Sequence, residues 1–224
     1  KDGLWRGDAS KLDTLNARRE KLLASSTDSL ERIYWLLEDA KRYGTLPFAG
    51  LARAGFMAVQ MLKSLVAVGV FSQADYETFI NSVSTVSGQL TRDRVVLNKT
   101  DFLACYGHLR PGTYDILSPR YDEAPELYFD WKQCSSVLEP VKPFAMTLPQ
   151  KRKISKLLEA HRLELDPEGL LEFIQAGIEM RELAKFHFTR NLSDALDLIV
   201  DVGAQHGFKR EDLAYCDIAA FKEL

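Results

Sequence analysis

The chain has 224 residues, of which 46% are hydrophobic and 27% are charged, a composition typical of a globular protein with a substantial core. Its 29 basic and 32 acidic residues give a formal net charge of -3, which argues against nucleic acid or an anionic membrane as a partner. The three cysteines, Cys105, Cys134 and Cys216, are odd in number and widely spaced, which favours reduced thiols in the cytoplasm over a disulfide framework.

The first clear helix is predicted behind Thr27 and Asp28, which can cap its start. Apolar residues recur there at helical spacing, and Gly44 is expected to end the helix in a left-handed conformation. Pro47 suits the first turn of the next helix, because the missing amide proton does no harm there. These apolar positions are Leu30, Ile33, Tyr34 and Leu37.

Small residues form a stripe along this second helix, which predicts close contact with another helix. The stripe consists of Gly50, Ala54, Gly55 and Ala58. The apolar run from Ala54 to Phe71 is nearly long enough to span a membrane, but Lys63 lies near its centre, where a lysine costs about 2.5 to 3.5 kcal/mol in a bilayer. A buried bundle helix is therefore favoured.

Two more helices are predicted before residue 107. Ser72 and Asp75 resemble a capping box at the start of one of them. The other is expected to run toward Tyr106 through Val96 and Phe102.

Residues 107–148 change character, since six prolines lie in or directly after this segment. We expect mostly loop with short helical turns, and its many aromatic residues predict that it packs against the helices as an ordered excursion. The prolines are Pro111, Pro119, Pro125, Pro140, Pro143 and Pro149.

Residues 149–224 return to helical spacing. Asp166 and Pro167 are typical of a helix start, and one or two long helices should follow, with Asn191 and Ser193 as a kink or cap between them. No useful alternating strand pattern appears. The prediction is an all-α fold, an irregular helical bundle in a single domain, 1–224, made of segments 1–106, 107–148 and 149–224.

The candidate binding residues lie in the turn-rich segment. Pro111 and Gly112 suit a type II turn that would hold His108 and Arg110 in place. With Arg120 and Asp115 they form a candidate substrate-binding or phosphate-binding set, because arginine offers a planar fork of donors and histidine can donate or accept. The alternative is structural: arginine–aspartate pairs, with Asp115, Asp122 and Glu123 as available carboxylates, would hold the loop to its own helices.

The other polar residues give weaker evidence for a functional site. Four on the predicted long helix are most simply a solvated face: Arg181, Glu182, Lys185 and Arg190. The remaining histidines lack metal-ligand spacing, so we expect no metal site. Cys105 is predicted to be a buried, inert thiol. Without a glycine-rich phosphate loop or a nucleophile motif, we predict no catalytic residue and no cofactor site in this chain.

Three segments carry a resemblance to a known family. Residues 106–123 read YGHLRPGTYDILSPRYDE, residues 181–193 read RELAKFHFTRNLS, and residues 207–215 read GFKREDLAY. Together with their surroundings, they resemble the helical middle region of the phosphoenolpyruvate synthase and pyruvate phosphate dikinase-like family, which includes rifampin phosphotransferase-like enzymes. Relatives commonly read Tyr-Gly-His-Arg-Gly-Pro where this chain has YGHLRPG, so its arginine is displaced by one position.

The resemblance implies a piece of a larger ATP-dependent phosphotransferase. The parent chain would add an ATP-binding domain, which uses ATP and Mg, and a swivelling histidine domain; the start at Lys1 rather than Met agrees with an excised segment. This piece would hold a small-molecule phosphoryl acceptor or dock the swivelling domain.

Two other functional classes stay open. One is a non-catalytic helical interaction or scaffold module, in which the turn-rich segment is a structural clasp. The other is a small hydrolase using Cys105 and His108, which is disfavoured because no third group is evident to orient the pair.

Overall fold

The computed structural model describes residues 4–131 and 142–219 of the chain. The secondary structure of these residues is helical, with no strand, which confirms the predicted all-α fold. In chain order the elements are α1 Leu4–Leu23, α2 Ser29–Asp39, the π-helical turn η1 Ala40–Thr45, α3 Leu46–Ala67, α4 Gln73–Ser82, α5 Val86–Val96, α6 Lys99–Tyr106, α7 Pro125–Tyr128, α8 Leu148–Ala160, α9 Pro167–Gln205 and α10 Arg210–Leu213.

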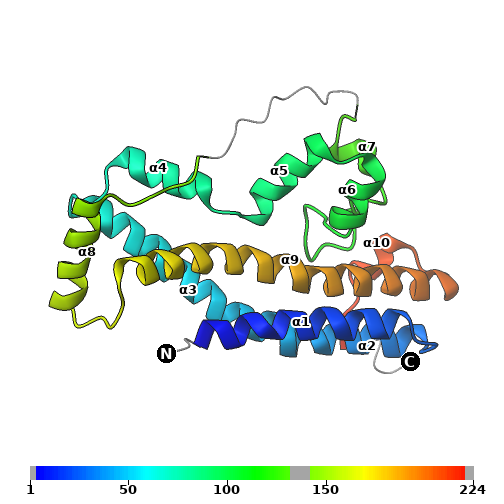
Figure 1. Ribbon diagram of the computed structural model, residues 1–224. Coiled ribbons are helices and arrows are strands. Elements are labelled where there is room, and N and C mark those ends of the chain that lie inside the picture. The colour runs from blue at the N-terminus through cyan, green and yellow to red at the C-terminus, as the bar shows by residue number, and fades with distance from the viewer. Residues whose placement is uncertain (1–3, 132–141, 220–224) are drawn as a thin grey trace.

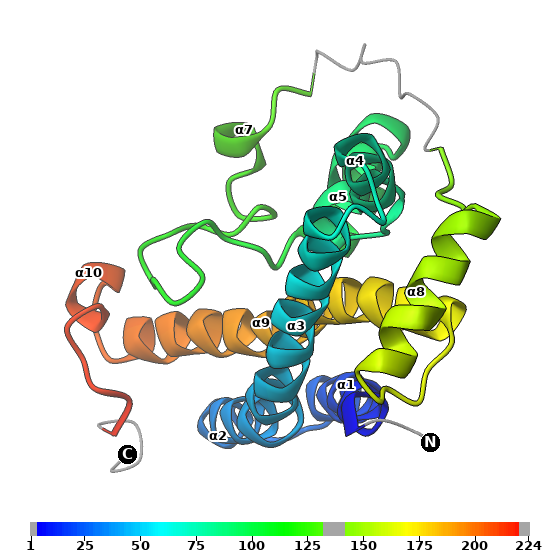
Figure 2. The same ribbon diagram turned by 90° about the vertical axis from the view of Figure 1, so that its left-hand side faces the viewer.

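The 39-residue helix α9 is the central element. It runs through the molecule with α1 and α2 along one side and α4 to α7 on the other (Figure 1). Helix α3 crosses α9 steeply, as Figure 2 shows, and these two helices share the most extensive contact. Asn191 and Ser193 lie buried within α9, so they mark neither a break nor a cap, and one long helix is present.

Glycines allow α3 and α9 to approach closely. A Cβ atom at Gly177 would lie 3.0 Å from the Cβ of Ala58 and 3.1 Å from the carbonyl oxygen of Ala54. A Cβ atom at Gly55 would lie 2.9 Å from the carbonyl oxygen of Gly177. The small-residue stripe predicted on α3 is therefore confirmed as a helix contact.

In the part of the chain that the structure describes, the apolar core has three parts, all of which involve α9. The largest joins the second half of α3 to α4, α8 and the start of α9, with Phe144 packed edge-on against Phe71 and Phe79. A second lies between α2, α10 and the end of α9, and a third between α1, α3 and the middle of α9. No described helix combines the length and apolarity needed to cross a membrane.

Local signals set several helix boundaries. Ser72 and Asp75 form the predicted capping box of α4, and the Asp166 side chain accepts a hydrogen bond from the Gly169 amide at the start of α9. Pro47 lies in the first turn of α3, as predicted. These boundaries depend on residues within one helical turn, which explains why they are readable from the sequence.

Two predicted boundaries were wrong. Gly44 does not end a helix in a left-handed conformation, because η1 connects α2 directly to α3. A Cβ atom at Gly44 would lie 2.5 Å from the Cβ of Phe188, so this glycine permits close packing on α9. The helix expected to pass through Val96 is two helices: Leu97 is extended, and the Asn98 side chain caps α6 by accepting from the Asp101 amide.

The described part of the turn-rich segment packs against the bundle. Apart from the short α7 it contains loops and turns, as predicted, and two of its aromatic rings, Phe129 and Trp131, pack against Phe102 of α6. The Phe102 ring centroid lies 5.1 Å from that of Phe129 and 5.8 Å from that of Trp131. Cys134 and Pro140 lie outside the described residues.

Candidate functional site

The turn that carries the predicted site is held by hydrogen bonds between residues close in sequence. The Gly112 amide donates to Ser118 Oγ over 3.1 Å, and the Leu117 amide donates to Asp115 Oδ1 over 2.9 Å. The predicted type II turn was wrong, because Gly112 does not have the positive φ that this turn requires. Its lack of a side chain matters for space instead, since a Cβ atom there would lie 2.8 Å from the Cβ of Asp115.

Arg110 extends from this turn onto α9 and is buried. Its Nη2 donates to Asp197 Oδ1 over 2.8 Å and to Ser193 Oγ over 3.1 Å, while its Nη1 donates to the Ser118 carbonyl over 3.1 Å. Only 2% of the Arg110 side chain is exposed. The guanidinium is therefore occupied by the protein's own acceptors.

Arg120 reaches the same part of α9. Its Nη1 donates to Asp197 Oδ2 over 2.6 Å and to Asp194 Oδ1 over 3.2 Å, and its Nη2 donates to Asp122 Oδ2 over 2.7 Å. Burial lowers the pKa of Arg120, but the hydrogen bond with Asp122 and the charge of Asp197 outweigh it, so the net shift is upward. Arg120 remains a cation shared between two segments.

These groups form a clasp, defined here as Arg110, Arg120, Ser193, Asp194 and Asp197. Asp197 bridges the two arginines, and Asp194 also pairs with Arg19 of α1 at 2.5 Å. Ser193, Asp194 and Asp197 were not among the predicted site residues. Their polar side chains stand among the apolar residues of α9, which could have marked them as unusual. The sequence pattern gives no indication, however, that they pair with arginines more than 70 positions away.

His108 lies beside the clasp and is 5% exposed. Its Nδ1 accepts from Arg190 Nε over 3.4 Å, and its ring packs edge-on against Phe186 with 4.8 Å between centroids. Burial, together with the positive charges of Arg190 and Arg120, lowers the pKa of His108 to about 3. The imidazole is therefore neutral at physiological pH, and with Nδ1 as an acceptor its proton is assigned to Nε2.

The lowered pKa makes the fold sensitive to acid. At pH values between the ordinary histidine pKa of about 6.5 and the folded pKa of about 3, His108 is protonated in the unfolded chain but neutral in the folded protein. This contribution to stability is complete above pH ~6.5 and decreases by roughly 1.4 kcal/mol per pH unit as the pH falls. We expect His108→Gln to flatten the profile of unfolding free energy against pH between ~6.5 and ~4, measured in urea. An unchanged slope would contradict the neutral assignment.

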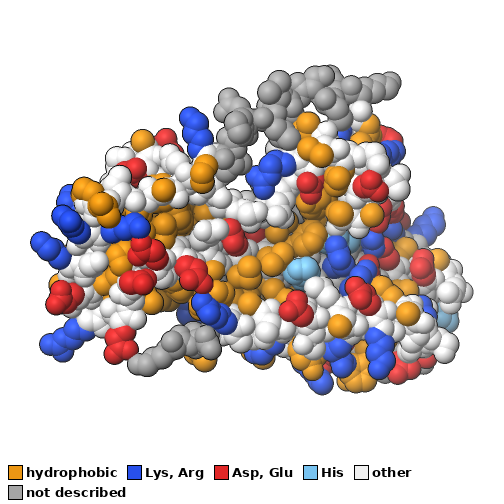
Figure 3. Space-filling view, in the orientation of Figure 1, with side chains coloured by type: hydrophobic (Ala, Val, Ile, Leu, Met, Phe, Trp, Pro, Cys, Tyr) orange, Lys and Arg blue, Asp and Glu red, His pale blue; other side chains and the backbone are white. Residues whose placement is uncertain are grey.

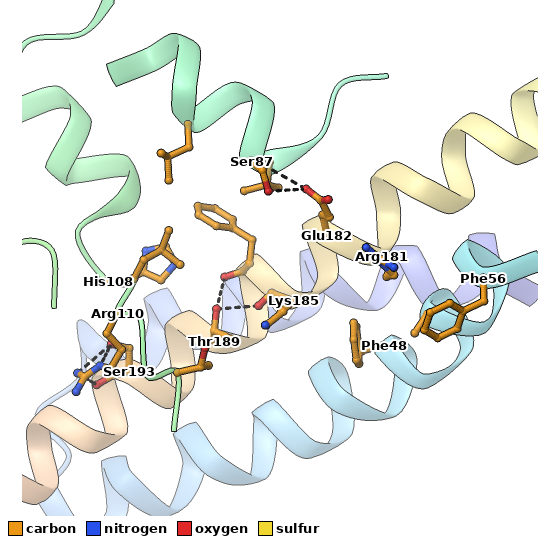
Figure 4. A pocket seen from close by; sticks show the side chains of 16 residues that line it. Phe48, Phe56, Ser87, His108, Arg110, Arg181, Glu182, Lys185, Thr189 and Ser193 are labelled. Atoms are coloured by element: carbon orange, nitrogen blue, oxygen red, sulfur yellow. Dashed lines mark hydrogen bonds between the residues drawn. The ribbon is translucent and has the colours of Figure 1, made fainter. Parts of the chain in front are cut away.

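A pocket of about 600 Å³ opens where the turn meets α3, α5 and α9 (Figure 4). Aromatic and aliphatic side chains form much of its wall, and the polar lining comes mainly from α9. The lining residues are Phe48, Ala52, Phe56, Val86, Ser87, Leu90, His108, Leu109, Arg110, Thr113, Arg181, Glu182, Lys185, Phe186, Thr189 and Ser193. His108 and Arg110 of the predicted set thus reach the pocket, while Asp115 and Arg120 are not among its lining residues.

The charged residues of α9 that line the pocket differ in whether they have hydrogen-bonding or ion-pair partners. The Glu182 carboxylate accepts from the Ser87 amide over 3.3 Å and from Ser87 Oγ over 3.2 Å, which docks the start of α5 (Figure 4). The Arg181 guanidinium lies 5.8 Å from the centre of the Phe56 ring. Within the described ranges, neither Arg181 nor the exposed Lys185 has a carboxylate partner. The pocket therefore offers two cations for a ligand.

Two predictions about single residues are corrected here. The α9 face was not simply solvated, because α5 packs across it and turns it into a pocket wall. Cys105 is exposed rather than buried, since α6 buries only Phe102 and Tyr106. The Cys105 carbonyl accepts a 3.0 Å hydrogen bond from Arg190 Nη2, so its backbone supports His108 through that arginine.

Comparison with known proteins adds no assignment. No protein-family model, curated protein or solved structure matches this chain. Among the residues that the structure describes, no group of three or more His, Cys, Asp or Glu is placed to hold a metal ion.

Proposed function

We propose that this chain is the helical middle domain of a cytoplasmic, phosphoenolpyruvate-utilising phosphotransferase of the dikinase type. In this proposal the pocket holds a small-molecule phosphoryl acceptor, or receives the swivelling domain that carries the phosphohistidine. The observation that supports it best is an apolar-walled pocket with two cations, Arg181 and Lys185, that have no carboxylate partner among residues 4–131 and 142–219. ATP and Mg would bind to another domain of the parent enzyme.

The chemistry required of such a domain is positioning and charge stabilisation. Phosphoryl transfer needs the acceptor oxygen aligned with a phosphoryl group whose negative charge is stabilised, and little covalent chemistry is left for the protein. Aromatic walls such as Phe48 and Phe186 suit the organic part of an acceptor, while Lys185 and Arg181 suit the transferred or resident anion. His108, held neutral by burial, is suited to hydrogen bonding rather than to charge pairing.

Under this proposal the clasp acts indirectly. Arg110 and Arg120 use their donors on Ser193, Asp194 and Asp197, so they would position His108 and Leu109 at the pocket wall. Their direct binding to phosphate stays a prediction, as does any ligand contact by Asp115. Among the described residues, the pocket cations available to a ligand without breaking an ion pair are Arg181 and Lys185.

Calorimetric titration tests the proposal. The ligands are phosphoenolpyruvate, pyruvate, inorganic phosphate, nucleotides and a panel of hydroxylated acceptors. We expect at least one anionic ligand to bind, and Lys185→Ala to weaken it about five- to tenfold, because the loss of one charge-assisted contact costs roughly 1 to 1.4 kcal/mol. The matched control is Lys63→Ala, which removes an exposed lysine of α3 that does not line the pocket. No binding, or equal weakening by both variants, would contradict the form of the proposal in which the pocket holds the acceptor.

A second candidate, a non-catalytic helical interaction module, is favoured by one observation. Arg110 and Arg120 are both paired with α9 carboxylates, as a structural clasp requires. This candidate predicts that clasp variants lose stability while ligand binding by the folded protein is unchanged. The acceptor-domain proposal instead predicts that loss of the clasp displaces the pocket wall and weakens binding.

A further inference from the structure

Helix α5 is weakly attached to the rest of the molecule. Among the described helices of eight or more residues, it alone contains no buried residue. It lies in an arm above α9, and Figure 3 shows hydrophobic side chains exposed between this arm and α9, so the arm is not sealed against the long helix on that face. A segment with little buried apolar surface opens at a low cost in free energy.

Two glutamates of α9 hold the start of α5. Glu179 Oε1 accepts a hydrogen bond from the Ser84 amide over 2.9 Å. Glu182 Oε2 accepts from the Ser87 amide over 3.3 Å and from Ser87 Oγ over 3.2 Å (Figure 4). Both serines are exposed, so water can take the place of the carboxylates as acceptor. We call these four residues the latch: Ser84, Ser87, Glu179 and Glu182.

The part of α5 that the latch holds is also a wall of the pocket. Val86, Ser87 and Leu90, all in the first turns of α5, line the pocket beside α9. The other end of α5 is held separately, because the Tyr106 hydroxyl of α6 donates to Asp93 Oδ2 over 2.7 Å. Opening of the latch would therefore displace the pocket wall while the end of α5 stays on α6.

Glu182 has a second partner within reach. Lys185 lies three positions further along α9, on the same helix face, and both side chains line the pocket. In the structure the Glu182 carboxylate is used by Ser87, and no ion pair joins it to Lys185. Once released from Ser87, the carboxylate is free to pair with Lys185, because glutamate and lysine attract each other at this spacing. Lys185 would then be less available to a ligand.

We propose that Glu182 is a two-position switch, which either holds α5 on α9 or pairs with Lys185. With the latch closed, the pocket wall is in place and Lys185 is free. An anion that binds Lys185 therefore favours the closed latch, and closure strengthens the binding of the anion by the same factor. The anionic ligand rests on the proposed function, whereas the two positions of Glu182 do not.

Ser87→Pro opens the latch selectively. It removes both donors to Glu182, and the position suits proline, because Pro47 and Pro149 also stand two residues after the N-cap threonines of α3 and α8. We expect the amides of α5 to exchange with deuterium about tenfold faster than in the wild type. Ala74→Pro, at the equivalent position of α4, is the matched control and should leave exchange in α5 unchanged.

The second position of Glu182 is tested by competitive acetylation of lysines, read by mass spectrometry. In Ser87→Pro we expect Lys185 to react about twofold more slowly than in the wild type, because a carboxylate partner stabilises the ammonium form. Adding Glu182→Gln should restore at least the wild-type rate, since glutamine carries no charge. Lys63, exposed on α3 and outside the pocket lining, is the internal reference.

Inorganic phosphate and phosphoenolpyruvate serve as anionic probes. A bound probe should slow exchange in α5 of the wild type, and Ser87→Pro should bind it about twofold more weakly. The switch is overturned if Ser87→Pro leaves exchange in α5 or acetylation of Lys185 unchanged, even if a probe binds. If neither probe binds while exchange and acetylation change as expected, the switch stands and the acceptor site of the proposed function is contradicted. Unchanged exchange in the rest of α9 shows that the variant is folded.

Discussion

Replacing Arg110 with methionine should lower the free energy of unfolding by about 3 kcal/mol, measured by urea denaturation. Methionine fills part of the volume but offers no donors, so Ser193 Oγ and the Ser118 carbonyl lose the guanidinium and Asp197 loses one of its two cations. The effect is large because the Arg110 side chain is 2% exposed, so water does not replace the lost hydrogen bonds.

The control for this prediction is Arg53→Met on α3. Arg53 is exposed and forms no ion pair within the described residues, so its replacement should change stability by less than about 0.5 kcal/mol. Ligand titration of the folded Arg110 variant then separates the two functional candidates. Unchanged stability with lost ligand binding would contradict the clasp and indicate direct contact between Arg110 and the ligand.

Gly177→Leu should destabilise the protein by about 3 kcal/mol or more, or prevent folding. A Cβ atom at this position already lies 3.1 Å from the Ala54 carbonyl oxygen, and a backbone atom cannot move aside as a side chain can. The leucine would force α3 and α9 apart at their crossing. Because Phe48 and Phe56 of α3 face Arg181 and Lys185 of α9 across the pocket, any folded fraction should also bind ligand more weakly.

Gly7→Ala is the control, and it should change the stability in the opposite direction. Gly7 lies in α1, and a Cβ atom there would meet no atom within 4 Å. Alanine is favoured over glycine in a helix by roughly 1 kcal/mol, so this variant should be slightly more stable than the wild type. Thermal unfolding of the two glycine variants side by side measures this difference, and equal effects would show that the helix crossing is less tightly packed than the distances indicate.

Helix α9 links all of these expectations. It supplies Asp194 and Asp197 to the clasp, Arg181 and Lys185 to the pocket, and Gly177 to the crossing with α3. Arg110 and Arg120 of the turn-rich segment form their ion pairs with this helix. A substitution that displaces α9 at any of these points should therefore also change the shape of the pocket.

The sequence predicted the features that depend on near neighbours. The all-α fold, the capping box of Ser72 and Asp75, the start of α9 at Pro167 and the irregular course of the described part of the turn-rich segment are all confirmed. The small-residue stripe on α3 was recognised as a contact surface for the same reason, since its spacing is visible within one helix. These features depend on interactions within a few residues, so they form in the same way whichever elements pack around them.

Packing decided the rest. Gly44 reads as a helix end, but its contact with Phe188, distant in sequence, lets the chain continue as a π-helical turn. Arg110 and Arg120 were identified as the residues of interest, but their partners on α9 are set by how the turn docks. By itself the sequence determined the all-α class, the capping box of α4, the start of α9 and the segment that carries the predicted site. Only the tertiary structure decided which charges are neutralised and which face a pocket, because ion pairing depends on distances between residues far apart in the chain.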